Sequence, residues 1–190
     1  MELNFIFTNF FVIDKLELEL SVIENYCYEL KKINPTVIKS NYGGWHSSDI
    51  EFNNPVIQPL LTMIKNRTQQ LLEITKMTHR YKISNMWVNI NGQGNYNHAH
   101  RHPFSFLSGI FYVKTKNNCG NLVFKNPNAL HENYIRPSDV VEYNGFNSES
   151  WRITPTENNL IIFPSWLEHF TNPNESGEDR ISISFNIELL

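Results

Sequence analysis

Short strand-like segments dominate the sequence after Thr78. Over 81–91, side chains at odd and even positions fall on opposite faces, the period of two that a β-strand has. Five similar segments follow, most of them separated by Gly, Pro or Asn, at 106–114, 121–125, 151–153, 159–163 and 181–189. A series of short strands like this predicts a β-sandwich or barrel.

Two segments with helical spacing precede these strands. The first covers 14–33, with Asp14 as a candidate N-cap and Pro35 just beyond its end. The second covers 55–77, which has no internal Gly and has Pro only near its start. A short strand is expected over 3–7. Together these segments indicate a mainly β (α+β) protein with flanking helices.

Composition limits the class of protein further. With 190 residues, 41% of them hydrophobic, the chain can form one domain, 1–190, with a sizeable core. A net charge of −3 argues against a broad nucleic-acid surface. Two cysteines are too few for a disulfide framework, which favours a reducing compartment. No targeting or membrane segment is visible, so we expect a cytoplasmic protein that binds neither nucleic acid nor membrane.

Three of the seven histidines fall within five residues, at His98, His100 and His102. Because alternate residues of a strand share a face, His98 with His100, or His100 with His102, could bind one metal. Neutral imidazole suits iron, zinc, copper and nickel. The alternative is a solvated histidine-rich turn. A run of this kind inside a chain is unusual outside metal sites, so it favours a metal site.

Two segments near the C-terminus extend this pattern. His169 follows an apolar strand and could supply a third ligand if the sheet curls into a barrel. Arg180, Ser182 and Ser184 share one face of the last strand, and a guanidinium fits a carboxylate through two parallel hydrogen bonds. Alone, these segments would read as a structural histidine and an exposed edge strand. Together with the histidine cluster they form an ordered set.

Five stretches carry a family resemblance: Trp87-x-Asn89, His100-x-His102-Pro103, Ser108–Val113, Phe163-Pro164-Ser165-Trp166-Leu167-x-His169 and Arg180–Asn186. With them the chain resembles the iron(II)/2-oxoglutarate-dependent oxygenase superfamily, and within it a branch found in marine phages and bacteria. The H-x-H-P and F-P-S-W-x-x-H motifs are typical of that branch. The resemblance implies a double-stranded β-helix, a jelly-roll barrel over 81–190, with 1–80 as helical support.

The resemblance also implies an iron site at one mouth of the barrel. The usual ligands are two histidines and one carboxylate in an H-x-D/E…H pattern. Here the carboxylate position holds a histidine in either register, which implies a three-histidine site. The H-x-H-P pattern favours His100, His102 and His169 as the metal ligands and leaves His98 as a neighbour or an alternative ligand.

Four further residues gain roles from the resemblance as contacts of the co-substrate. Arg180 would pair with the distal carboxylate of 2-oxoglutarate, and Ser182 would hydrogen-bond it. Tyr112 would hold the same carboxylate, although it could equally be ordinary core. Asn89 could reach the other end of the co-substrate, because an inward polar group on a strand needs a partner.

The implied activity is Fe(II)/2-oxoglutarate-dependent hydroxylation, in which 2-oxoglutarate is decarboxylated to succinate and a substrate C–H is hydroxylated. Two alternatives stay open. One is a cupin-like metal enzyme without an oxoacid; its motif lacks the expected Glu here, and Arg180 would have no role. The other is a non-catalytic jelly-roll binding module, which the missing carboxylate favours and the retained His169 and Arg180 disfavour.

The substrate and the partners are not readable from the sequence. A protein residue, a small metabolite and a lipid-like acid are all compatible, as are a monomer and a homodimer. A phage-encoded copy would act in the host cytoplasm. A substrate lid is expected in the Gly-rich loop 42–48 or in the long loop 126–150. Aromatic residues that could line the pocket are Trp45, Tyr96, Phe104, Phe106 and Trp166.

Overall fold

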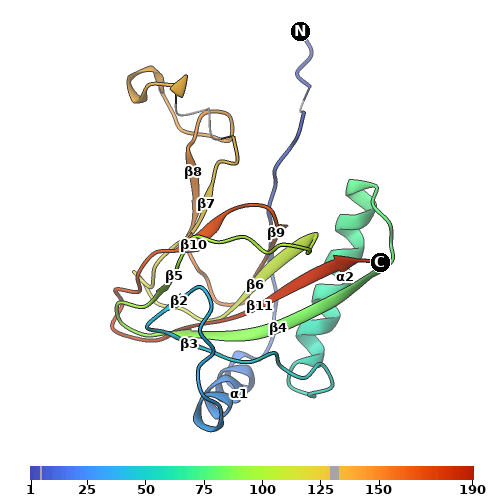
Figure 1. Ribbon diagram of the computed structural model, residues 1–190, viewed down its shortest axis with the longest axis vertical. Coiled ribbons are helices and arrows are strands. Elements are labelled where there is room, and N and C mark those ends of the chain that lie inside the picture. Colours follow the sequence, from blue (N-terminus) through green and yellow to red (C-terminus); the bar gives the residue numbers. More distant parts are fainter. Residues whose placement is uncertain (5, 129–132) are drawn as a thin grey trace.

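The computed structural model describes residues 1–4, 6–128 and 133–190, which form antiparallel sheets and two α-helices (Figure 1). In chain order the elements are β1 (Val12–Lys15), α1 (Leu20–Ile33), β2 (Asn41–Tyr42), β3 (Trp45–His46), α2 (Gln58–Thr75), β4 (Tyr81–Asn91), β5 (Tyr96–Asn97), β6 (Leu107–Lys114), β7 (Leu122–Lys125), η2 (Pro137–Asp139), β8 (Ser150–Ile153), β9 (Asn159–Pro164), β10 (His169–Thr171) and β11 (Arg180–Leu189). The six-stranded sheet has the order β1-β9-β6-β11-β4-β3, a second sheet has the order β10-β7-β8, and β2 pairs with β5.

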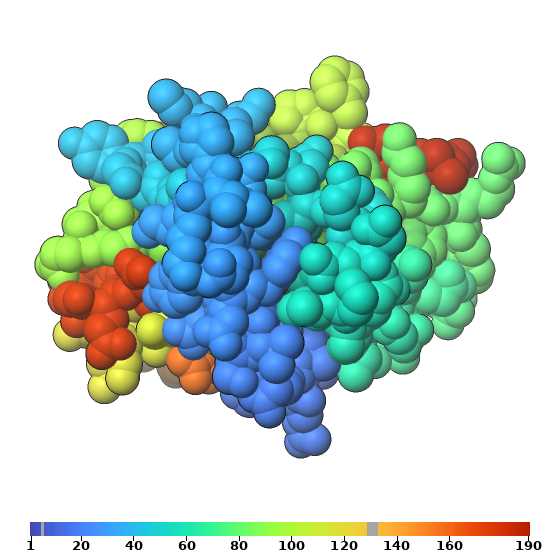
Figure 2. All heavy atoms as spheres, turned by 90° about the horizontal axis from the view of Figure 1, so that it is seen from below, coloured from blue at the N-terminus to red at the C-terminus, as the bar shows by residue number. Residues whose placement is uncertain are grey.

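The two helices cover one face of the six-stranded sheet. Figure 2 shows this side of the molecule, with α1 in blue and α2 in teal. Alternate side chains of β4 and β11, among them Val88 and Ile183, pack into a large apolar core together with Ile23 of α1 and Ile64 of α2. Neither helix is long and apolar enough to cross a membrane.

The opposite face of the same strands carries buried polar side chains. Asn89 and Asn91 on β4 and Ser182 and Ser184 on β11 are each at most 8% exposed. Across from them, a smaller apolar core joins β6, β7 and β9 through residues that include Ile110, Leu122 and Phe163. A polar strip is therefore enclosed between the sheets, where each polar group needs a partner.

The strand series predicted from the sequence is confirmed. β4 has the expected range, 81–91, and each of the other five strands differs from its expected range by one residue at one end. α2 lies within the expected segment 55–77. The mainly β fold with flanking helices is therefore confirmed, because the period-two pattern is encoded locally in each strand.

The N-terminal prediction was wrong at two points. α1 begins at Leu20, because the preceding residues form strand β1 and pair with β9. Asp14 lies within β1 and is not a helix cap. No strand forms in the described part of 3–7, and residue 5 lies outside the described residues.

The Gly-rich segment 42–46 contributes strands rather than a loop. β2 pairs with β5, and β3 extends the large sheet beside β4. Gly43 has a φ of +72°, which a turn between the two strands requires. A Cβ on Gly44 would lie 2.0 Å from Asn91 Oδ1, so a larger residue there would displace the side chain of Asn91. Residues 1–80 thus supply strands as well as helices.

The segment 126–150 is a long loop in its described part. It contains the 3-10 turn η2, and an ion pair of 2.9 Å joins Arg136 and Asp139 there. Residues 129–132 of this predicted loop lie outside the described residues. Figure 1 shows the loop projecting beyond β7 and β8, away from the helices.

Candidate metal and co-substrate site

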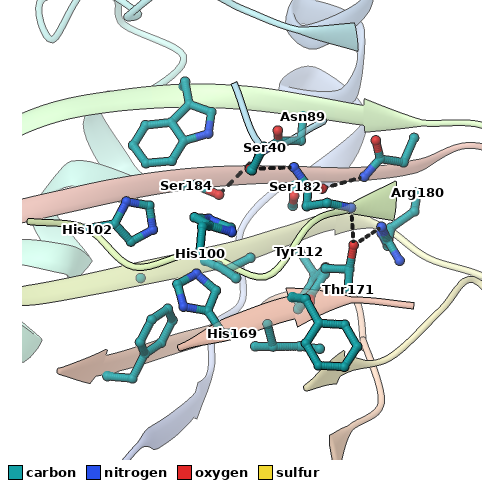
Figure 3. A pocket seen from close by; sticks show the side chains of 18 residues that line it. Ser40, Asn89, His100, His102, Tyr112, His169, Thr171, Arg180, Ser182 and Ser184 are labelled. Atoms are coloured by element: carbon teal, nitrogen blue, oxygen red, sulfur yellow. Dashed lines mark hydrogen bonds between the residues drawn. The ribbon is translucent and has the colours of Figure 1, made fainter. Parts of the chain in front are cut away.

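Three histidines from two segments meet inside the barrel (Figure 3). His100 and His102 lie between β5 and β6, and His169 is the first residue of β10. The backbones of His100 and His169 exchange two hydrogen bonds of 3.0 Å. One potential ligand atom of each imidazole lies within 4.8 Å of the other two. Nitrogens that share one ion lie up to about 4 Å apart, so small side-chain movements complete a shared site.

Backbone carbonyls hold two of these imidazoles in a fixed orientation. His100 Nδ1 lies 2.6 Å from the carbonyl oxygen of His98, and His169 Nδ1 lies 2.9 Å from that of Leu167. A carbonyl can only accept, so each Nδ1 carries the proton and donates it. The Nε2 lone pair of each ring is then free to bind a metal.

The three imidazoles are neutral at neutral pH. Burial, with a smaller contribution from His100, lowers the pKa of His102 to about 4. Burial also lowers the pKa of His100, and it lowers that of His169 well below its usual value. Neutral imidazole is the form that binds metals, so this set of donors fits a divalent ion such as Fe(II).

The side chain of His98 lies outside this cluster. Its ring contacts Tyr96 edge-on, with centroids 5.0 Å apart, and also contacts Tyr42 at 5.9 Å. Its contribution to the site is the backbone carbonyl that accepts from His100. The structure thus brings together His100, His102 and His169 and separates His98 from them.

Arg180 lies at the start of β11 and is only 2% exposed. Its Nη1 donates to three backbone carbonyls, those of Cys119, Gly120 and Asn172, and its Nη2 donates to Thr171 Oγ1. No Asp or Glu among the described residues pairs with it. A buried charge without a counter-ion is strongly destabilising, so an anionic ligand is expected beside Arg180.

One pocket joins the histidine cluster to Arg180. The predicted co-substrate residues Asn89, Tyr112 and Ser182 all line it (Figure 3). Burial raises the pKa of Tyr112 to about 12, so its phenol stays protonated and able to donate. The pocket therefore has a cluster of imidazoles in one part and a guanidinium surrounded by hydroxyl groups in another.

Asn89 has an unfilled hydrogen-bonding group in this pocket. Its Nδ2 donates to Ser184 Oγ at 3.3 Å, while its buried Oδ1 has no partner among the described residues. Turning the amide around would let Ser184 donate to the oxygen and would direct the NH₂ group into the pocket. In either orientation, a polar ligand or a water molecule is needed to complete the contacts of Asn89.

Four polar lining residues were missed from the sequence, namely Ser40, Asn91, Asn97 and Thr171. Thr171 follows His169 by two residues on β10, so the alternation of strand faces could have found it. Ser40 comes from the segment before β2, and no local pattern marks it. Asn97 links the two, since its Nδ2 donates to Ser40 Oγ and its backbone N–H to Thr171 Oγ1.

The five aromatic residues proposed as pocket lining lie elsewhere. The aromatic side chains that line the pocket are Trp87, Tyr112, Phe163 and Phe170. Trp45 belongs to the core on the helix side of the sheet, and Phe104 is 98% exposed. The prediction was wrong because aromatic content alone does not say which face of a sheet a ring occupies.

Comparison with known families gives one match over more than half of the chain. A family described as "Putative 2OG-Fe(II) oxygenase" matches residues 85–186. The matched range includes the three clustered histidines and Arg180. A comparison with curated protein sequences gives no match.

Solved structures share the fold at low sequence identity. A prolyl-4-hydroxylase of Pseudomonas putida has a TM-score of 0.66 at 12% identity, over 96% of this chain and 94% of that one. A viral collagen prolyl hydroxylase of Paramecium Bursaria Chlorella virus-1, solved with 2OG, has a TM-score of 0.63 at 14% identity, over 95% of this chain and 96% of that one. The alpha ketoglutarate dependent epimerase SnoN from nogalamycin biosynthesis has a TM-score of 0.69 at 12% identity, over 94% of this chain and 76% of that one. The double-stranded β-helix predicted from the sequence is thereby confirmed.

Proposed function

Since the chain belongs to this 2OG-Fe(II) oxygenase family, we propose that it hydroxylates a substrate at the pocket between the three histidines and Arg180. Fe(II) and 2-oxoglutarate are the cofactors of the family. The observation that carries the proposal is the buried, unpaired Arg180 in the same pocket as a cluster of neutral imidazoles. The part of the pocket around the guanidinium favours an anionic ligand, and the part around the imidazoles favours a metal cation.

We assign the metal to His100, His102 and His169. The carbonyls of His98 and Leu167 keep two of these rings in the tautomer that leaves Nε2 free. Bound iron, with 2-oxoglutarate, would supply the activation of O₂. Three neutral ligands leave the full charge of a divalent ion uncompensated, so this site favours an anionic co-substrate more than a site with a carboxylate ligand does.

We assign the distal carboxylate of 2-oxoglutarate to Arg180. The guanidinium would pair with it, and the hydroxyl groups of Tyr112 and Ser182 would donate to its remaining lone pairs. Asn89, on the same strand as Trp87, would contact the co-substrate nearer the histidines. The buried guanidinium would then gain the counter-ion that it lacks among the described protein groups.

The substrate and the narrower relationships stay proposals. The structural neighbours include prolyl hydroxylases and an enzyme from nogalamycin biosynthesis, so a protein residue and a small molecule are both candidates. The H-x-H-P and F-P-S-W-x-x-H motifs support membership of the branch from marine phages and bacteria. A non-catalytic binding module is the second candidate, favoured by the histidine that replaces the usual carboxylate ligand.

The response to 2-oxoglutarate tests the proposed function. Anaerobic protein loaded with Fe(II) should bind 2-oxoglutarate in calorimetry and gain thermal stability from it. Arg180→Ala should lose this binding at least about 100-fold while keeping its metal, because a charge-assisted double hydrogen bond is removed. Arg136→Ala, which changes an exposed arginine in the 126–150 loop, is the matched control. A wild-type protein that ignores 2-oxoglutarate contradicts the proposal.

A further inference from the structure

Thr171 connects three parts of the pocket through one hydroxyl group. It is the last residue of β10 and lines the pocket that contains the histidines and Arg180. Its Oγ1 accepts a hydrogen bond of 2.8 Å from the backbone N–H of Asn97 and one of 3.0 Å from Arg180 Nη2 (Figure 3). The hydroxyl therefore joins β5, which leads into the histidine loop, to the guanidinium.

These two bonds determine where the hydroxyl hydrogen can point. A threonine hydroxyl has two acceptor lone pairs and one donor hydrogen. Both lone pairs of Thr171 are occupied, by Asn97 and by Arg180, so only the hydrogen remains. No described residue accepts it, and Thr171 is a lining residue, so the hydrogen is directed into the pocket. A donor without an acceptor is unfavourable away from water, and a ligand oxygen would satisfy it.

Arg180 has unfilled donors beside this hydroxyl. A guanidinium carries five N–H groups, and the three carbonyls around Nη1 and the oxygen of Thr171 take three of them. The Nε–H and one Nη2–H have no acceptor among the described residues. The hydroxyl group of Thr171, the Nε–H of Arg180 and one Nη2–H of Arg180 are thus three neighbouring donors without an acceptor among the described residues. The group that accepts several such donors and offers none is a carboxylate.

We infer that Thr171 is a specificity-determining residue, which donates its hydroxyl hydrogen to the carboxylate paired with Arg180 and so selects dicarboxylic over monocarboxylic 2-oxo acids. The inference rests on the proposed function, since it concerns the distal end of the co-substrate. It adds a donor that neither the H-x-H…H pattern nor the Arg180-x-Ser182 pattern contains. It also explains why a polar residue stands on β10 next to the apolar lining residues Leu122 and Phe170.

Binding of two 2-oxo acids to three proteins tests the inference. The ligands are 2-oxoglutarate and 2-oxopentanoate, which has the same chain length and a methyl group in place of the distal carboxylate. Wild type, Thr171→Val and Thr171→Ser are loaded anaerobically with Fe(II), and their dissociation constants are measured by calorimetry. Valine keeps the size of threonine without its hydroxyl group, whereas serine keeps the hydroxyl group.

We expect Thr171→Val to bind 2-oxoglutarate about 10- to 100-fold more weakly than wild type, the loss typical of one hydrogen bond to a charged group. Its affinity for 2-oxopentanoate should stay within about twofold of wild type, and Thr171→Ser should behave as wild type with both ligands. A purely structural role would weaken both ligands equally, and that result overturns the inference. So does a Thr171→Val protein with unchanged affinity for 2-oxoglutarate.

Three further results are distinguishable from these. A wild-type protein that binds neither oxo acid refutes the proposed function, and the inference with it. A wild type that binds both oxo acids equally refutes the inference together with the assignment of the distal carboxylate to Arg180. A wild type that prefers 2-oxoglutarate, with the same preference in Thr171→Val, leaves that assignment intact and refutes the inference alone. If Thr171→Val does not hold its metal, Thr171→Ala removes the same hydroxyl with less bulk, and the same ratio of affinities decides.

Discussion

The position of Arg180 depends on a glycine far from it in the sequence. Gly120 has a φ of +87°, in the left-handed region that side chains other than glycine rarely adopt. A Cβ at this position would lie 2.7 Å from Arg180 Nη1 and 2.2 Å from the carbonyl oxygen of Asn172. Because Gly120 has no side chain, its own carbonyl and that of Asn172 can both accept hydrogen bonds from Arg180 Nη1 and fix the direction of the guanidinium.

Gly120→Ala should disturb co-substrate binding without removing the metal. The added methyl group displaces Arg180 Nη1 or the carbonyl next to it, and the left-handed backbone costs about 1–3 kcal/mol of stability. We expect weaker binding of 2-oxoglutarate in calorimetry, a lower melting temperature and unchanged metal content. Gly145→Ala, where an added Cβ meets nothing within 4 Å, is the control. Equal behaviour of the two variants would contradict this role of Gly120.

The three clustered histidines should each be needed for metal binding. His100→Ala, His102→Ala and His169→Ala each remove one of three imidazoles whose ligand atoms converge, so stoichiometric metal should be lost. His98→Ala should retain the metal, because its side chain packs on Tyr42 and Tyr96. Metal analysis of the purified variants gives the answer. Loss of metal from His98→Ala with retention in His102→Ala would shift the ligand register by two residues.

Residues with a chemical signature of their own could be placed in the site from the sequence. The histidine run and Arg180 stood out because imidazole and guanidinium groups suggest specific ligands. Thr171 did not stand out, because its role comes from hydrogen bonds to Asn97 and Arg180 that only the folded chain brings to it. Gly120 was missed for the same reason, since its neighbours are backbone atoms of other segments.

At the level of elements, the sequence predicted strands that show their own alternation and missed those that depend on a distant partner. β4 is visible in its own eleven residues. β1 has four residues and pairs with β9 near the other end of the chain, so no local pattern defines it. Its carboxylate at Asp14 accepts a hydrogen bond from Arg67 of α2, a contact that a helix-cap reading of Asp14 could not anticipate.

The strands β2 and β5 illustrate the same limit. Each has two residues, too few for a periodic signal. Side-chain amides link this strand pair to the polar face of the large sheet. Asn91 Nδ2 on β4 donates to Asn97 Oδ1 on β5 at 3.0 Å, and Asn97 Nδ2 donates to Ser40 Oγ. These contacts place Ser40 over the pocket. The segment expected to be a loop thus carries two short strands, β2 and β3, which pair with β5 and β4.

At the level of the whole molecule, the large sheet has an apolar face and a polar one. The apolar face packs on α1 and α2 and holds most of the core. The polar face carries four histidines with a lowered pKa: His46 and His169, which are buried, and His100 and His102, which are half-buried. Stability of the barrel interior is therefore coupled to the protonation of these rings.

The metal-free protein should lose stability as the pH falls from about 6.5 to about 4. In the unfolded chain these histidines titrate near pH 6.5, whereas in the folded protein their pKa values are lower, about 4 for His102. Between the two values the unfolded state binds more protons, so protonation favours unfolding and stability is fully present only above about pH 6.5. The shift at His102 alone corresponds to about 3 kcal/mol.

Urea unfolding of chelator-treated protein at pH 7.5, 6.5, 5.5 and 4.5 measures this effect. The unfolding free energy should decline over that range by several kcal/mol in wild type. In His102→Gln the decline should be shallower, because glutamine has no proton to gain. Fe(II) should preserve stability to lower pH, since protons and metal compete for the same nitrogens. Parallel pH profiles for wild type and His102→Gln would show that the pKa of His102 is not lowered in the folded protein and would contradict its burial in the cluster.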